Sequence, residues 1–247
     1  MLKKCQNIIN PKFFIGFCVL ELLVLITLKT VQMVFPTSIA DTFLMFIAIV
    51  FNTICMLFLV SRVKKAGKDT ALYGIPLAIF LTFLADCFLV LAYDLSEAGV
   101  INFISVFTCN MFGFFIFGLV QIAYAYYLGI TKRRLIIRIG FYLVFLAVIA
   151  ILGLLTWDRF VACVSMSQLI LNVVYAWIEY KKKNTKQSLL LALGITLFLG
   201  CDALIMMRML LPKGGIVYAI IAFMVWVFYI PSQVVLTSSY LVDRIDA

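Results

Sequence analysis

The chain is built from long apolar runs separated by short clusters of charge, and this pattern restricts it to one class of fold. Thr42 to Ser61, Ala98 to Thr131 and Gly214 to Val242 contain no charged residue. A helix needs about 20 consecutive apolar residues to cross a bilayer. Soluble domains carry about 25% charged residues, whereas this chain of 247 residues carries 13% and is 66% hydrophobic. The sequence therefore predicts an integral membrane protein of the all-α class.

The apolar runs between charge clusters predict a polytopic bundle of eight transmembrane helices. We place these helices near residues 13–35, 42–61, 72–93, 101–129, 135–156, 160–178, 188–211 and 216–241. The uncharged stretch Ala98 to Thr131 is too long for one upright span, so we expect a tilted helix with a loop there. The first apolar run lacks a small-residue cleavage site behind it, so we interpret it as a first helix rather than a removable signal peptide.

The basic residues predict the orientation of the bundle, because Lys and Arg concentrate in cytoplasmic loops. With these spans, sixteen of the 20 Lys and Arg residues fall on one side of the membrane and two on the other. The clusters are Lys3 to Lys12, Arg62 to Lys68, Lys132 to Arg138, and Lys181 to Lys186, with Arg244 in the tail. We therefore expect both termini to be cytoplasmic, in a multi-pass protein of the plasma membrane. The clusters lack interleaved aromatic residues, which argues against nucleic acid as a partner.

Polar residues recur in the two halves of the chain at nearly one spacing. The pairs are Asn52 and Asn172, Asp86 and Asp202, and Gln121 and Gln233, and their separations run from 112 to 120 residues. This spacing predicts a duplication within one membrane domain, residues 1–247, with four helices in residues 1–131 and four in 132–247. Because each half has an even number of spans, the repeats would be parallel. Chance matches in an eight-helix chain are the alternative.

The absence of histidine narrows the chemistry that this chain can perform. Without histidine there is no Ser-His-Asp or Cys-His centre and no HExxH zinc helix. Asp86 and Asp202 lie within apolar spans, where an ionisable residue indicates function by default. If the repeats bring them together, apolar surroundings favour one protonated acid and one ionised base. The alternatives are two aspartates that hydrogen-bond for helix packing, or a proton or ion relay. We expect no metal and no cofactor.

Other polar residues within the spans are candidates for binding a substrate. These are Asn52, Gln121, Tyr124, Asn172, Tyr229 and Gln233, together with the charged Glu21 and Arg208. The amides can line a polar pocket, or they can serve only as hydrogen-bonding groups between helices. Arg208 can reach the membrane interface along its own stem or contact a lipid phosphate. Glu21 has the alternative of a structural hydrogen bond to a neighbouring helix.

At these residues the sequence resembles the lysoplasmalogenase family of membrane proteins, also called YhhN-like. That family has eight helices, with Gly-Asp late in the third and Ser-Asp in the seventh. The corresponding pairs here are Ala85-Asp86 and Cys201-Asp202, and the family's Tyr-x-x-x-Gln in the last helix matches Tyr229 and Gln233. The family's His-x-x-Tyr in the fourth helix is matched only in part, by Gln121 and Tyr124.

The resemblance implies hydrolysis of the vinyl ether bond of a lysoplasmalogen, a membrane lysophospholipid, to a fatty aldehyde and a glycerophospho-headgroup. Asp86 and Asp202 would be the acid and base of that reaction, and no cofactor would be needed. Glutamine at position 121 would weaken this activity or direct it to another lipid ether. The alternatives are a proton-coupled transporter built from the two repeats and a lipid-binding membrane protein without catalysis.

Overall fold

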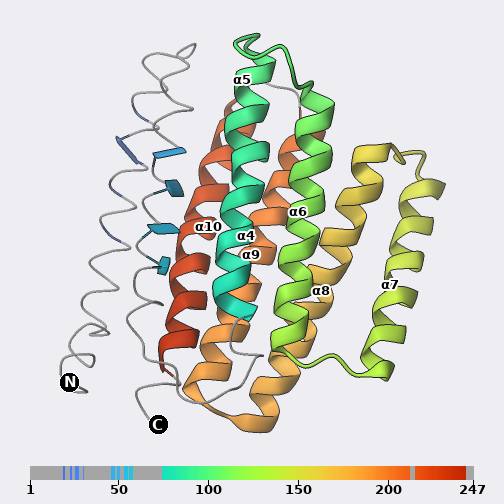
Figure 1. Cartoon of the computed structure of the whole chain (residues 1–247), viewed down its shortest axis with the longest axis vertical. Helices are drawn as coiled ribbons and strands as arrows, with labels where there is room; N and C mark the ends of the chain where they lie inside the picture. The colour runs from blue at the N-terminus through green and yellow to red at the C-terminus, as the bar shows by residue number, and fades with distance from the viewer. Residues whose placement is uncertain are drawn as a thin grey trace. The chain divides into compact units, whose positions relative to one another are not determined.

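The computed structural model describes residues 74–211 and 215–242, together with isolated helical positions between residues 19 and 57. Its continuous elements are α4 (Gly74–Asp86), the π-helix η2 (Cys87–Ala92), α5 (Tyr93–Glu97), α6 (Val106–Tyr127), α7 (Lys132–Ile151), α8 (Trp157–Lys183), α9 (Lys186–Leu210) and α10 (Ile216–Val242). Every regular element among the described residues is a helix (Figure 1), so the all-α class is confirmed. The first two predicted spans, 13–35 and 42–61, lie outside the continuously described residues.

Six helical stretches in the described residues are long and apolar enough to cross a membrane. They are Gly74–Glu97, Val106–Tyr127, Lys132–Ile151, Arg159–Lys183, Lys186–Arg208 and Ile216–Tyr240. The first of them combines α4, η2 and α5 in one rod. These helices support an integral membrane protein and correspond to the last six predicted spans.

The helix ends differ from the predicted boundaries for local reasons. The uncharged stretch from Ala98 contains a loop and then α6, which starts after Ser105, whose side chain accepts a hydrogen bond from the Thr108 amide. α7 ends at Ile151 rather than near 156, because Gly153 adopts a left-handed conformation with a φ of 67°. α8 begins at Trp157, earlier than predicted.

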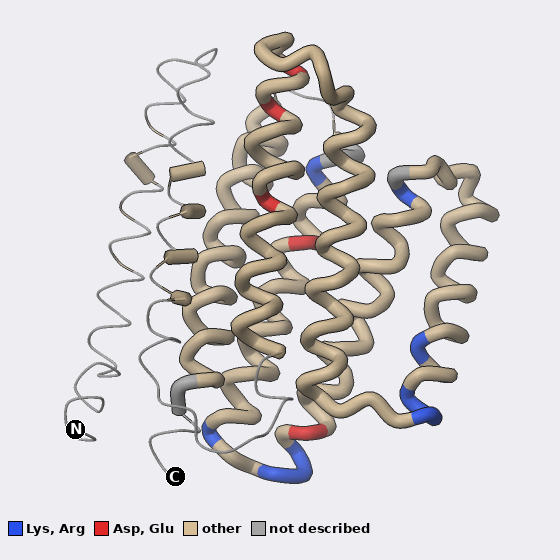
Figure 2. The backbone as a smooth tube through the Cα atoms, viewed as in Figure 1, with Lys and Arg blue, Asp and Glu red and all other residues tan. Residues whose placement is uncertain are grey.

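The predicted span boundaries place the basic clusters 132–134 and 181–183 in connecting loops, but in the structure both clusters are helical, so this prediction is wrong. Lys132 opens α7, because Thr131 caps the helix by accepting a hydrogen bond from the Arg134 amide. Lys181 to Lys183 form the last turn of α8, where cations interact favourably with the helix dipole. Figure 2 shows the basic residues gathered at the start of α7 and around the α8–α9 connection.

One compact unit contains residues 74–175, from α4 through Tyr175 of α8. In it α4 packs along α6 so closely that a Cβ atom on Gly74 would lie 2.9 Å from the Ala123 carbonyl oxygen. α6 contacts α8 where Ser165 donates a hydrogen bond to the Phe114 carbonyl oxygen at 2.9 Å. α7 lies beyond α8 in this unit (Figure 1).

A second compact unit contains the described residues from 176 onward, comprising the end of α8, α9 and α10. α9 packs along α10 at Gly194, where a Cβ atom would lie 2.7 Å from the Leu236 side chain. Trp177 of α8 donates a hydrogen bond from Nε1 to Thr196 Oγ1 of α9 at 3.0 Å. The division into repeats 1–131 and 132–247 stays a prediction.

Candidate functional site

Asp86 lies where the third predicted span changes its helical type. It is the last residue of α4 and the N-cap of η2, and its side chain is half-buried. π-helical turns inside α-helices are rare and occur frequently at functional sites. Asp86, a candidate because it is a charged residue within an apolar span, therefore also lies at the start of a π-helix.

Asp202 lies in the second unit, within α9, and is also half-buried. On α10 the two residues of the Tyr-x-x-x-Gln pattern, Tyr229 and Gln233, are both buried. Tyr229 packs edge to face against Phe198 of α9, with ring centroids 6.3 Å apart. The amide nitrogen of Gln233 is buried without a hydrogen-bond partner in the described residues. Such a nitrogen is a donor that a bound group can use.

The two aspartates belong to different compact units, so their pairing stays a prediction. Asn52 and Glu21 lie outside the described residues. Arg208 occupies the last turn of α9, and its guanidinium lies 5.5 Å from the centroid of the Tyr218 ring. That geometry is a cation–π contact. The Tyr218 ring covers one face of the guanidinium. The predicted contact of Arg208 with a lipid phosphate stays a prediction.

Two of the predicted amide residues meet directly in the first unit. Asn172 of α8 donates from Nδ2 to the Gln121 backbone oxygen at 2.9 Å and to Gln121 Oε1 at 3.1 Å. Both side chains are fully buried, as is Tyr124 one turn further along α6. Gln121 and Asn172 thus join α6 to α8 inside this unit.

A third helix contributes a cation to this pair, and sequence reasoning missed it. Arg138 of α7 is 4% exposed, and it donates to Asn172 Oδ1 at 2.7 Å and to Gln168 Oε1 at 3.0 Å. From the sequence, Arg138 counts only as one of the basic residues that predict the orientation of the bundle. A signal was present, because Gln168, Asn172 and Tyr175 fall at helical spacing on one face of α8.

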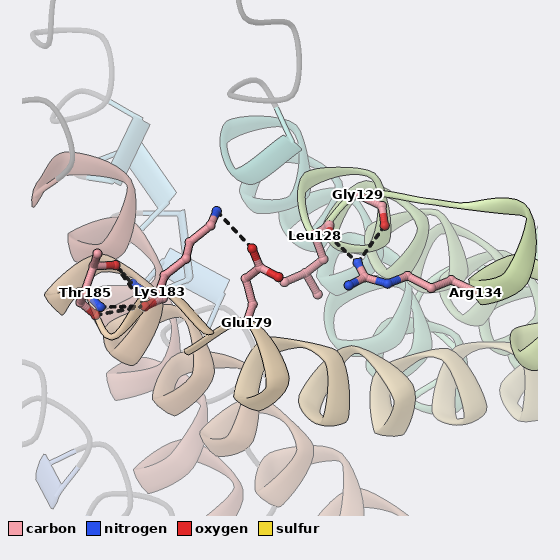
Figure 3. A network of polar contacts seen from close by, with 7 residues as sticks. Leu128, Gly129, Arg134, Glu179, Lys183 and Thr185 are labelled. Atoms are coloured by element: carbon pink, nitrogen blue, oxygen red, sulfur yellow. Dashed lines mark hydrogen bonds and ion pairs between the residues drawn. The ribbon is translucent and has the colours of Figure 1, made fainter. Parts of the chain in front are cut away.

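Arg134, one turn before Arg138, holds the connection between α6 and α7. Its Nη1 donates to the carbonyl oxygens of Leu128 at 2.6 Å and Gly129 at 2.8 Å (Figure 3). These carbonyls belong to the end of α6, where backbone acceptors have no helical donor. Figure 3 also shows the ion pair between Glu179 and Lys183 at the end of α8, with 3.0 Å between the charged atoms.

Comparison with protein families places these residues in a known group. The model of the YhhN family matches residues 44–240. This range includes both aspartates and the hydrogen-bonded residues Gln121, Arg138 and Asn172. The chain belongs to the YhhN family. YhhN proteins include lysoplasmalogenases. No curated protein and no solved structure matches the chain.

The structure shows the contacts of Gln121, the position at which the resemblance to lysoplasmalogenases leads us to expect histidine. The Gln121 amide oxygen accepts the hydrogen bond from Asn172, while its amide nitrogen has no partner among the described residues. A neutral amide holds partners in place but does not exchange protons as an imidazole does. Gln121 can therefore hold a partner by hydrogen bonding but cannot act as an imidazole acid or base.

Proposed function

We propose that this protein hydrolyses the vinyl ether bond of lysoplasmalogens, giving a fatty aldehyde and a glycerophospho-headgroup. The observation that carries the proposal is the YhhN family match over residues 44–240, which contains Asp86 and Asp202. The half-buried position of each aspartate within an apolar helix supports it. The π-helix that begins directly after Asp86 adds a local backbone feature typical of functional sites.

The two carboxyl groups would divide the reaction into steps that balance without a cofactor. One carboxylic acid protonates the β-carbon of the vinyl ether, which leaves an oxocarbenium ion at the α-carbon. The other group, a carboxylate, stabilises this cation and removes a proton from the water that attacks the α-carbon. The resulting hemiacetal gives its hydroxyl proton to the carboxylate left by the first step and breaks its bond to the glycerol oxygen, which takes the proton that the second carboxyl group removed from water. The products are the aldehyde and the free glycerol hydroxyl group.

The proposal predicts the effect of removing each carboxyl group. Asp86→Asn and Asp202→Asn should each lower aldehyde release from a lysoplasmalogen by about 100-fold or more, because general acid–base catalysis contributes at least that much. The rate is measured with the purified full-length chain in mixed micelles, by trapping the aldehyde as a hydrazone. The matched control is Asp94→Asn, which makes the same change in α5, later in the same helical stretch Gly74–Glu97.

The control and the fold of the variants decide how the result is read. Asp94→Asn should keep the wild-type rate, and all three variants should keep the wild-type unfolding temperature. Full activity of either Asp86→Asn or Asp202→Asn would overturn the proposed acid–base pair. A saturated 1-alkyl lysophospholipid should release no aldehyde, because it has no vinyl carbon to protonate.

A further inference from the structure

α7 turns its apolar side chains outward and buries an arginine. Its exposed residues include Ile136, Ile139, Leu143 and Val144, and Arg138 is its one buried residue in the described structure. An exposed apolar surface is what a helix needs when it faces lipid. A charged residue that turns inward from such a helix is costly and marks a functional contact by default.

The contacts of Arg138 leave its charge without compensation in the described part of the chain. Its two terminal nitrogens donate to the neutral amide oxygens of Gln168 and Asn172, and its guanidinium lies 5.1 Å from the centroid of the Tyr175 ring. A second guanidinium, that of Arg134, lies 4.8 Å from the same ring. No carboxylate forms an ion pair with Arg138 among the described residues. A buried cation of this kind is stabilised strongly by an anion that joins it.

Arg138, Asn172 and Gln121 form a buried polar cluster with the half-buried Gln168, and two hydrogen-bond donors in it lack a partner in the described part of the chain. They are Arg138 Nε and Gln121 Nε2, and neither has a partner in the described residues. The orientation of the amides is fixed, because Asn172 must present its oxygen to Arg138 and therefore its nitrogen to Gln121. Gln121 in turn must present its oxygen to Asn172, so its amide nitrogen has no hydrogen-bond partner in the described residues. Because Gln121 Nε2 and Arg138 Nε are both donors, a group that binds to them must be a hydrogen-bond acceptor.

The depth of Arg138 in the membrane favours a lipid phosphate as the anion. Arg138 lies six residues after Lys132, the first residue of α7, which is about 9 Å along the helix axis. The headgroup layer of a bilayer is roughly 5–7 Å thick on each side. With Lys132 to Arg134 in the headgroup layer, Arg138 reaches the boundary where lipid phosphates meet the hydrocarbon. Arginine presents its donors in a fork that suits phosphate oxygens.

We propose that Arg138 and Gln121 bind the phosphate group of a single-chain phospholipid, with the guanidinium Nε and the amide Nε2 each donating to a phosphate oxygen. This assignment rests on the proposed function, since it locates the headgroup phosphate of the substrate. It gives the Arg138–Asn172–Gln121 chain the task of placing the lipid, while the aspartates perform the chemistry.

Binding of an ester-linked lysophospholipid tests the proposal, because that lipid has no vinyl ether and is not turned over. Its dissociation constant for the full-length chain in detergent is compared with that of a monoacylglycerol of the same chain length, which lacks the phosphate. The wild type should prefer the lysophospholipid by about tenfold to a hundredfold, as expected for charge-assisted hydrogen bonds. Arg138→Gln should remove this preference and leave monoacylglycerol binding unchanged.

Two further variants keep the test decisive if Arg138→Gln fails to fold. Gln121→Glu keeps the size of the side chain and its acceptor for Asn172, but replaces the open donor with an oxygen that repels phosphate. It should remove the preference without lowering the unfolding temperature. Arg133→Gln removes an exposed charge from the first turn of α7, and should keep the preference.

The remaining outcomes overturn the assignment or part of it. Equal binding of the two lipids by the wild type, or an equal loss of preference in Arg133→Gln, would overturn it. Competition by inorganic phosphate or glycerophosphate at the affinity of the lysolipid would overturn the lipid as the source of the phosphate. Retained phosphate preference with no aldehyde release would contradict the proposed function and leave this site intact. Aldehyde release without phosphate preference would overturn this phosphate site and leave the proposed function intact.

Discussion

At the scale of single residues, Asn172 is the link on which the buried polar cluster depends. Asn172→Leu should lower the free energy of unfolding by about 1–3 kcal/mol, because it leaves donors of Arg138 and the oxygen of Gln121 without a partner. The change is measured by SDS titration of the purified protein in mixed micelles. The control is Asn110→Leu on α6, where the side chain is half-buried. An equal effect of both substitutions would contradict the linking role.

Part of this cluster could be predicted from the sequence and part could not. Gln121 and Asn172 stand out because polar side chains within apolar spans are few, and the structure shows them in contact. Arg138 was missed because its charge already had an explanation in the positive-inside pattern. Which way a side chain turns from its helix depends on the neighbours of that helix, and the sequence does not list them. The pairing of Asp86 and Asp202 stays a prediction, because the two residues belong to different compact units.

At the scale of the elements, apolar runs predicted where the spans lie, because the bilayer demands about 20 such residues wherever it is crossed. The observed ends of α7 differ from the predicted ends because capping residues fix them, namely Thr131 before the helix and Gly153 after it. The π-helix from Cys87 to Ala92 was not predicted. It changes the hydrogen-bonding register of the backbone without changing composition, so hydropathy carries no trace of it.

The packing of α9 against α10 leads to a prediction in which two similar substitutions have opposite signs. Gly194→Ala should destabilise the protein by about 1–3 kcal/mol, because its Cβ would meet Leu236. Gly140→Ala on α7, where a Cβ would meet nothing within 4 Å, should stabilise it by up to about 1 kcal/mol through helix propensity. Unfolding by SDS titration measures both. The interface would be misassigned if Gly194→Ala raised stability as Gly140→Ala does.

At the scale of the whole molecule, the charge pattern predicts eight spans with both termini in the cytoplasm. A fluorescent protein that matures only in the cytoplasm should therefore fluoresce when fused to either terminus. The same reporter inserted after Gly99, in the connection between α5 and α6, should stay dark because this connection is expected on the opposite side. Fluorescence from only one terminus would require an odd number of spans and contradict the predicted bundle.

In the proposed reaction, intramembrane aspartates protonate a carbon atom of a vinyl ether. Hydrolysis of a lysoplasmalogen in D2O with the purified protein, followed by mass spectrometry of the trapped aldehyde, detects this step. Carbon protonation predicts one deuterium on the carbon next to the aldehyde carbonyl, at a rate that falls about 100-fold or more in Asp86→Asn. No aldehyde from the wild type, or labelled aldehyde released equally fast by Asp86→Asn, would contradict carbon protonation by these aspartates.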